Sequence, residues 1–142
     1  MTLKSRLLCL SAMVPLMLSL PAAPALAHQV EVANDVGGTL HIEPNDVPRV
    51  GRDNLTWFAL TQRGGRTIPL SACRCTLSVK SAGETIATPA LQAITAEGYQ
   101  GIPSASVTFP RPGQYELVLT GRPATGDNFR PFTLRFDVTV AR

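Results

Sequence analysis

The sequence predicts an all-β fold, a single antiparallel β-sandwich, and three observations carry that prediction. Apolar and polar residues alternate along several short runs, which is the period of a half-buried strand. Turn-forming residues punctuate these runs, with 11 Gly and 12 Pro in the chain. No segment shows the sustained three-and-four spacing of apolar residues that an amphipathic helix needs. About six to eight strands without helices are expected to pack as two antiparallel sheets.

The strands are predicted from particular runs. The clearest alternation lies in residues 132–140, whose apolar face carries Phe132, Leu134, Phe136, Val138 and Val140. Residues 115–119 alternate in the same way, and residues 55–60 (LTWFAL) are apolar on both faces, as expected of a central strand. Glycine-containing turns are predicted at residues 35–38, 63–66 and 110–113. Residues 89–97 allow one helical turn at most, and residues 81–104 receive no firm assignment as strand or loop.

The first 27 residues are predicted to be a cleaved signal peptide. Lys4 and Arg6 precede an apolar run over residues 7–20, and Ala25-Leu26-Ala27 forms the small-x-small pattern of a cleavage site. The apolar run is shorter than the roughly 20 residues that a membrane span needs. The mature chain, 28–142, is therefore expected to be one domain without a membrane span, located in the periplasm or secreted.

Charge narrows the expected partners. The formal net charge is +3, and Lys4 and Arg6, both in the predicted signal peptide, supply two of these charges. No run of basic residues occurs in the mature chain, so neither a nucleic acid nor an anionic membrane is an expected partner. Any partner is expected to be a periplasmic or membrane protein, and the sequence does not predict an oligomeric state.

Cys73 and Cys75 stand one residue apart in the run SACRCTLSV. They share parity with Leu77 and Val79, so both are predicted to face inward. Residues two apart in a regular strand lie roughly 6.6 Å apart at Cα, whereas a relaxed disulfide brings the Cβ atoms to about 3.8 Å. A disulfide therefore requires a bulge or turn at Arg74, although an oxidising compartment favours it.

Two other interpretations of the cysteines stay open. A pair of thiolates on a straight strand could bind a soft metal, Cu(I) or zinc, because sulfurs about 4 Å apart suit Zn–S bonds of about 2.3 Å. The two residues could also remain reduced and serve only in packing. A straight strand at Arg74 would favour one of these, and a bulge would favour the disulfide.

The only two histidines of the chain, His28 and His41, form a second candidate metal site. Cleavage after Ala27 makes His28 the N-terminal residue, whose α-amine and imidazole can chelate one ion, and Cu(II) favours such nitrogen ligands. If residues 35–38 close a hairpin, Val32 lies opposite His41, and His28 lies about 13 Å further along. Only a chain end that folds back would then join the two; otherwise His28 frays and His41 is a half-exposed strand residue.

No enzyme is predicted. The sequence has no Gly-x-Ser-x-Gly, His-Glu-x-x-His or phosphate-binding glycine loop, and His41 is the only interior histidine of the mature chain. Asp46 and Asp53 flank the turn-like segment PNDVPRVGRDN and are interpreted as solvated loop carboxylates, with a calcium-like site as the alternative. A copper oxygenase built on His28 is conceivable, but Tyr99 is the one exposed-looking aromatic residue that could face a polysaccharide.

Part of the chain resembles a known group of domains. In residues 41–79, Pro44, Pro48 and Gly51 precede a strand and Gly64-Gly65 marks a hairpin, which resembles the first half of the YtkA/FixH-like exported Ig-like domains. Residues 109–119 (FPRPGQYELVL) are similar to the closing Pro-Gly-x-Tyr strand of that group. The resemblance covers residues 41–79 and 107–120 and rests on turns and strands. It implies an Ig-like β-sandwich, and members of the group often occur in copper and respiratory-oxidase contexts.

The chain is also partly similar to two kinds of copper-binding protein. A Cys-x-Cys on a β-sandwich is similar to the copper site of cytochrome oxidase assembly factors, although the residues that flank that site are missing around Cys73 and Cys75. A mature N-terminal histidine is similar to that of exported copper-resistance carriers. Those carriers add methionine ligands, whereas the three methionines of this chain all lie within residues 1–17.

Two hypotheses follow for the function. The first is an exported β-sandwich that binds or carries copper, with Cys73 and Cys75 for Cu(I) or His28 and His41 for Cu(II). The second is a structural or protein-interaction module, in which the two cysteines form a disulfide or belong to the core.

Overall fold

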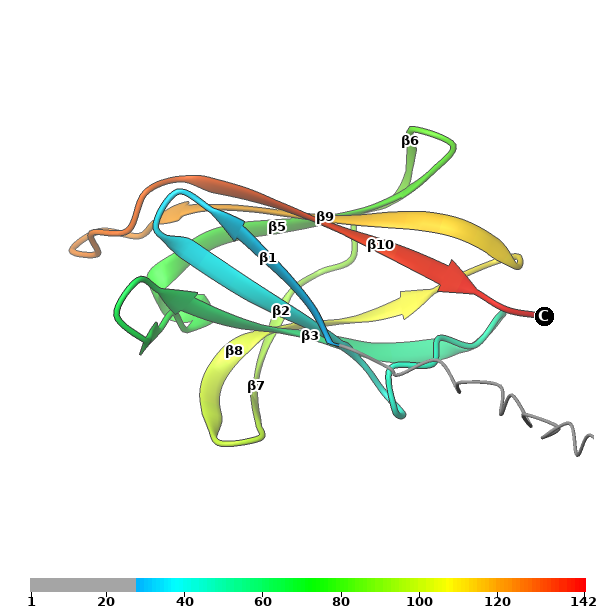
Figure 1. The fold of residues 1–142 in the computed structure, drawn as a ribbon, viewed down its shortest axis with the longest axis horizontal. Coiled ribbons are helices and arrows are strands. Elements are labelled where there is room, and N and C mark those ends of the chain that lie inside the picture. The colour runs from blue at the N-terminus through cyan, green and yellow to red at the C-terminus, as the bar shows by residue number, and fades with distance from the viewer. Residues whose placement is uncertain (1–27) are drawn as a thin grey trace, which may run out of the picture.

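The computed structural model describes residues 28–142, which form ten strands in two antiparallel sheets (Figure 1). The predicted signal peptide, residues 1–27, lies outside the described residues. The first sheet has the order β1 (Gln29–Ala33), β2 (Val36–Ile42), β3 (Asp53–Gln62), β8 (Tyr99–Thr108) and β7 (Gln92–Ala96), with β4 (Arg66–Thr67) paired to β3. The second has the order β10 (Phe132–Val140), β9 (Gly113–Pro123), β5 (Cys73–Ser81) and β6 (Glu84–Ala87).

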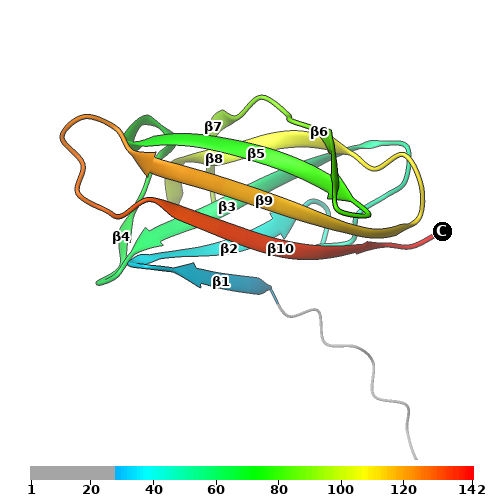
Figure 2. The same cartoon turned by 90° about the horizontal axis from the view of Figure 1, so that it is seen from above.

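The two sheets pack face to face and confirm the predicted antiparallel β-sandwich. Figure 2 shows β5, β9 and β10 running side by side, with β2, β3 and β8 in the layer behind them. At one edge of the sandwich, β1 of the first sheet lies beside β10 of the second. A single 3-10 turn, η1 (Leu70–Ala72), leads into β5.

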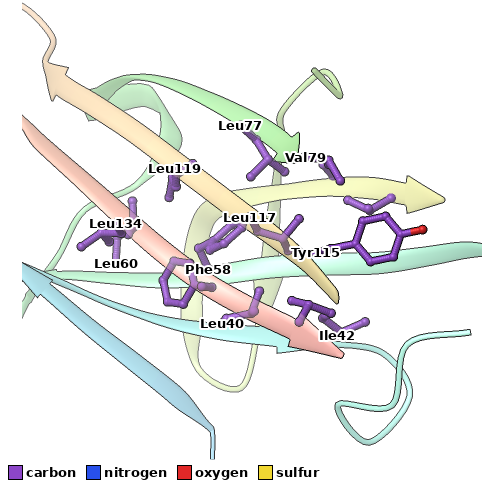
Figure 3. Packing of buried hydrophobic residues seen from close by; sticks show 14 of the residues in the cluster. Leu40, Ile42, Phe58, Leu60, Leu77, Val79, Tyr115, Leu117, Leu119 and Leu134 are labelled. Carbon is purple, nitrogen blue, oxygen red and sulfur yellow. The ribbon is translucent and has the colours of Figure 1, made fainter. Parts of the chain in front are cut away.

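The core lies between the sheets and follows the predicted alternation. All five apolar residues of the 132–140 run are buried, and the residues between them are exposed. Figure 3 shows how the layers meet: Leu77, Leu117, Leu119 and Leu134 of the second sheet pack against Leu40, Phe58 and Leu60 of the first. Each such side chain contributes about 1.5–3 kcal/mol of hydrophobic stabilisation, so this interface holds the sandwich together.

The first hairpin differs from the predicted turn at residues 35–38. Ala33 pairs with Val36, so the turn consists of Asn34 and Asp35, and Asn34 takes a positive φ of 56°. Gly37 and Gly38 instead lie inside β2. Gly38 is needed there for close packing, since a Cβ on it would lie 2.5 Å from Leu134 Cδ1. Gly38 therefore serves the core, and an asparagine supplies the left-handed turn conformation.

The unassigned segment 81–104 is also extended. It contains β6, β7 and the beginning of β8, so residues 89–97 contain a strand where one helical turn was allowed. Both β6 and β7 are largely exposed, which explains why their sequences lack a clear buried face. The predicted turns at residues 63–66 and 110–113 are confirmed, because β3 and β4, and β8 and β9, are joined there.

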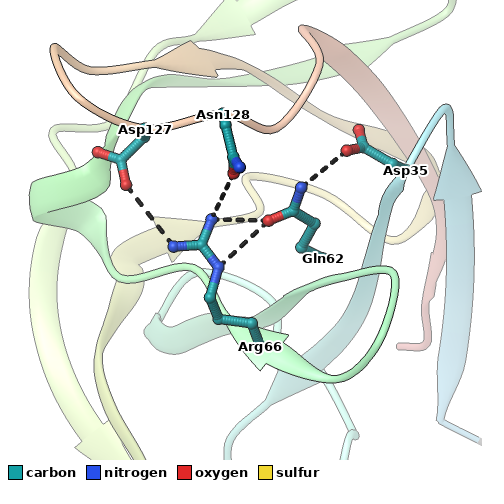
Figure 4. Close-up of polar contacts among 5 residues, drawn as sticks. All are labelled: Asp35, Gln62, Arg66, Asp127 and Asn128. Atoms are coloured by element: carbon teal, nitrogen blue, oxygen red, sulfur yellow. Dashed lines mark hydrogen bonds and ion pairs between the residues drawn. The ribbon is translucent and has the colours of Figure 1, made fainter.

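A polar network fastens the loop before β10 to the first sheet (Figure 4). The guanidinium of Arg66 donates to Gln62 Oε1 and to Asn128 Oδ1, at 2.6 and 3.1 Å. Gln62 in turn donates to Asp35 Oδ2 at 2.9 Å, and Asp35 Oδ1 accepts the backbone N–H of Arg130 at 2.8 Å. The Asn34–Asp35 turn is therefore bonded both to β3 of the first sheet and to the loop before β10.

Candidate metal site beside the first hairpin

The register of the first hairpin brings the two histidines together. Gln29 pairs with Leu40, so the next position along places His28 opposite His41. The two imidazole rings lie 4.4 Å apart between centroids. The predicted separation of about 13 Å is therefore wrong. It assumed a turn at residues 35–38, and the shift of the turn to Asn34–Asp35 moves His28 level with His41.

Asp46 is the third member of this cluster. It lies in the turn that follows β2, where its Oδ1 accepts the backbone N–H of Ile42 at 2.8 Å and its own N–H donates to Ile42 O at 2.7 Å. Its Oδ2 lies 3.0 Å from His28 Nδ1, and its Oδ1 lies 3.9 Å from His41 Nδ1. Asp46 is therefore not the solvated loop carboxylate that the sequence predicts, because it contacts both histidines.

The pairing of Asp46 with Asp53 as a calcium-like site finds no counterpart in the described residues. Asp53 begins β3, and its Oδ1 accepts the hydroxyl of Thr108 at 2.7 Å. The three-residue group His28, His41 and Asp46 is the set of candidate ligands in residues 28–142. No sequence pattern could have identified Asp46 as a ligand. Its carboxylate reaches the two histidines only because a turn reverses the chain directly after β2.

His41 is held in a fixed orientation by its surroundings. Its ring stacks on Trp57 of β3, its register partner, with centroids 3.8 Å apart and planes 4° from parallel. Trp57 is itself anchored, because its indole N–H donates to Glu43 Oε1 at 3.1 Å. Only 7% of His41 is exposed. Sequence reasoning missed these supports, which lie on the outer face of the first sheet.

Burial also sets the charge state of His41. It disfavours the imidazolium and lowers the pKa of His41 below its ordinary value, with the nearby Asp46 carboxylate acting in the opposite direction. His41 is consequently neutral at pH 7, with a ring nitrogen lone pair free to bind a metal ion. His28 is more open, with 54% of its side chain exposed, so the site has one fixed and one adjustable imidazole.

The three side chains have the geometry of a small ion site. One ligand atom of each lies within 4.8 Å of the other two. They line a hollow of about 180 Å³ together with Glu43, Asn45 and Glu97. Two nitrogens and one carboxylate oxygen suit a borderline divalent ion such as Cu(II) or zinc, and the surrounding acidic residues add negative potential.

The cysteines lie at the other end of the sandwich and are joined as a disulfide. Both face inward, as predicted: Cys73 is buried and Cys75 half-buried, with Leu77 and Val79 buried further along. The expected bulge at Arg74 does not occur, because Cys73, Arg74 and Cys75 pair in unbroken register with β9. Their Cα atoms lie 5.3 Å apart, so the beginning of the strand contracts enough to form the bond without a bulge.

In the disulfide form neither sulfur is a thiolate. A Cu(I) or zinc site at Cys73 and Cys75 therefore remains a prediction that concerns only the reduced protein. It would also be separate from the histidine site. His28 shares a hollow with residues 137–139 near the end of β10, whereas Cys75 shares one with Pro131 and Phe132 near its beginning.

Comparisons with known proteins support the fold and leave the family open. No family model and no curated protein matches the chain. A DUF4426 family protein from Pseudomonas aeruginosa PAO1 is similar in structure, with a TM-score of 0.54 and 14% identity over 80% of this chain and 99% of the other. FetP of uropathogenic E. coli strain F11, expressed in the periplasm, is similar with a TM-score of 0.55 and 13% identity over 80% and 93%.

At this level of identity the similarity shows the fold alone. The resemblance to YtkA/FixH-like domains is supported only as far as a small β-sandwich of a kind also found in these structures. No helix within residues 28–142 is long and apolar enough to cross a membrane.

Proposed function

We propose that the chain is an exported β-sandwich that binds Cu(II) through His28, His41 and Asp46. The main support is that one ligand atom of each of these three side chains lies within 4.8 Å of the other two. The side chains come from the residue before β1, from β2 and from the turn after β2. The chain's only two histidines meet there, across a hairpin whose turn is bonded to β3 and to the loop before β10. Nitrogen-rich sites bind Cu(II) more tightly than other divalent first-row metals.

Export strengthens the proposal because it changes His28 chemically. Cleavage after Ala27 gives His28 a free α-amine, which forms a chelate with its own imidazole. Together with His41 this makes three nitrogen ligands and one oxygen, a set that suits the tetragonal preference of Cu(II). The predicted signal peptide supports export, and the similar FetP was recovered from a periplasmic expression.

The test uses the full chain expressed with its own leader and recovered from the periplasm. Mass spectrometry establishes whether the protein begins at His28, metal analysis gives copper per chain, and electron paramagnetic resonance reports nitrogen ligands. We expect about one Cu(II) per chain with nitrogen hyperfine structure. Copper should also quench the emission of Trp57, the only tryptophan, because its ring lies 3.8 Å from that of His41.

Variants assign the ligands. His41→Ala and Asp46→Asn should weaken copper binding by more than the roughly 10–100-fold that loss of an outer-shell contact causes. One alanine inserted between Ala27 and His28 in the mature protein should remove the amine chelate and the corresponding spectrum. Asp53→Asn is the matched control, since this carboxylate bonds Thr108 outside the cluster. Mature protein that binds no stoichiometric copper, or binds it equally in all variants, would reject the proposal.

The second candidate function is a structural or protein-interaction module. It is favoured by the exposed valines of the edge strand β1, where Val30 and Val32 are 60% and 72% exposed. In that case the partner would be a periplasmic or membrane protein, and the disulfide would contribute only to stability. Cys73→Ala/Cys75→Ala should then lower the melting temperature, chiefly because the buried Cys73 loses packing contacts, and leave partner binding intact.

A further inference from the structure

We infer that the Cys73–Cys75 disulfide is a site of thiol–disulfide exchange with a dithiol partner. The bond lies at the beginning of β5, with Cys73 buried and Cys75 half-buried. This asymmetry provides one sulfur for attack from outside and one that stays protected behind it. Exchange requires access to one sulfur, a means to stabilise thiolate, and a fold that does not depend on the bond.

The first requirement, access, is met by a hollow of about 490 Å³ at the end of the second sheet, where residues 74–76 of β5, residues 120–122 of β9 and the beginning of β10 meet. Cys75 lines it together with Thr76 of the same strand, Thr120 and Gly121 of β9, and Pro131 and Phe132 at the beginning of β10. Gly121 is the register partner of Cys75, so no side chain on β9 covers the sulfur from that position. A Cβ at Gly121 would collide with the Phe132 ring and lie 2.7 Å from Cys73 Sγ, so the aromatic ring and the buried sulfur both pack against this glycine.

The second requirement concerns two arginines that line the same hollow as Cys75, although strand alternation directs their side chains to the opposite face of the sheet. Arg74 stands between the cysteines, and its register partner on β9 is Arg122. Both are exposed, both line the hollow, and neither takes part in an ion pair within residues 28–142. Like charges directly opposite on a sheet are destabilising unless an anion lies near. A cysteine thiolate would supply that anion, and nearby arginine increases the thiolate fraction.

The third requirement concerns stability. A disulfide stabilises mainly by closing a loop in the unfolded chain, and the effect grows with loop length. This bond joins residues separated by only two positions, so it constrains very little. The surrounding strands pair in regular register on β9 and hold both cysteines in place without it. Reduction should therefore leave the sandwich folded.

The exchange proceeds in two steps. The thiolate of a partner dithiol attacks Cys75 Sγ; the Cys73–Cys75 bond breaks, and its electron pair goes to Cys73, which takes up a proton. The second thiolate of the partner then attacks the partner's own sulfur in the mixed disulfide, and Cys75 leaves as a thiolate in the hollow that Arg74 and Arg122 also line. The partner leaves as a disulfide, so two electrons pass from it to this chain.

The test measures reduction of the folded, periplasmically processed protein by dithiothreitol, with acid quenching, alkylation and mass spectrometry. We expect reduction within a factor of about ten of the rate for a small-molecule disulfide, with no loss of the folded circular dichroism spectrum. The unfolding rate is measured by proteolysis under the same conditions. A reduction rate no faster than this unfolding rate would overturn the inference.

Single-cysteine variants test the asymmetry. In Cys73→Ala the remaining Cys75 should react with an aromatic disulfide reagent at least about tenfold faster at pH 7 than Cys73 does in Cys75→Ala. Arg74→Gln/Arg122→Gln should slow Cys75 several-fold at pH 7 and leave the rate unchanged at about pH 10, where all the thiol is ionised. Arg135→Gln is the control, because Arg135 lies on the same sheet but bonds Glu116 at 3.0 Å.

Equal rates for the two cysteines, or equal rates with and without the arginines at pH 7, would contradict the inference. The result is independent of the proposed copper site. His41→Ala and Asp46→Asn should leave the exchange rate unchanged, and the arginine variants should leave Cu(II) binding unchanged. The exchange measurements and the copper measurements can therefore each reject one proposal without affecting the other.

Discussion

Replacement of Asn54 by alanine should destabilise the protein by about 2–4 kcal/mol. Asn54 is 1% exposed, and its side chain fixes the loop that leads from Asp46 back into β3. Its Oδ1 accepts the N–H of Arg49 at 2.8 Å. Its Nδ2 approaches three backbone carbonyls, those of Arg49, Arg52 and Val107, at 2.9–3.0 Å.

The magnitude follows from which groups lose their partners. Nδ2 has two hydrogens, so the side chain makes about three full hydrogen bonds. Water can replace the partners of the exposed Arg49 and Arg52, while the carbonyl of Val107 is left buried. One buried unsatisfied group costs about 1–3 kcal/mol, and each of the two hydrogen bonds that water replaces costs about 0.5 kcal/mol, the low end of the net value of a hydrogen bond.

Chemical denaturation followed by Trp57 emission measures this change, and the melting temperature should fall by roughly 6–15 °C for a domain of this size. Asn128→Ala is the matched control, because Asn128 is exposed and accepts only from Arg66. It should cost under about 1 kcal/mol. A loss below about 1 kcal/mol for Asn54→Ala would refute the argument that the buried amide fixes the loop.

Two further predictions concern the first hairpin. The backbone N–H of Arg130 lowers the pKa of Asp35, so its contribution to stability is present above about pH 4 and is lost as the pH falls toward the lowered pKa. The melting temperature of Asp35→Asn should therefore fall less than that of the unmodified protein between about pH 5 and pH 3. An equal fall in both proteins would contradict this role of Asp35. Gly38→Ala should cost about 1–3 kcal/mol in urea denaturation because its Cβ collides with Leu134. Gly37→Ala is the control, with its nearest neighbour at 3.6 Å; equal losses would contradict the packing argument.

The sandwich was predictable because alternation is a local property of a half-buried strand. Residues 132–140 show this most clearly, since every second residue is apolar and every one of those is buried. Residues 84–96 gave no such signal because β6 and β7 lie at the edges and have little buried surface to encode. The inward orientation of Cys73 and Cys75 was likewise available from parity alone.

The candidate metal site was not predictable in the same way, because it depends on a register. Both Asn34-Asp35 and Gly37-Gly38 are turn-forming pairs, and local sequence does not choose between them. The choice is made by packing, since Gly38 is needed where β2 approaches Leu134. The disulfide depends on a local backbone detail instead, because the two Cα atoms at the beginning of β5 lie 5.3 Å apart rather than the roughly 6.6 Å of a regular strand.

The same register makes the copper proposal depend on where the leader is cut. His28 lies one position before β1, and its partner across the hairpin is His41. Cleavage after Ala27 places the new amine on the residue that already contacts Asp46. Cleavage even two residues earlier would move the amine about 6.6 Å along the chain and leave only side-chain ligands. Under the copper proposal, a protein with the two imidazoles but a longer N-terminus should therefore bind copper more weakly, and one peptide bond would link export to metal binding.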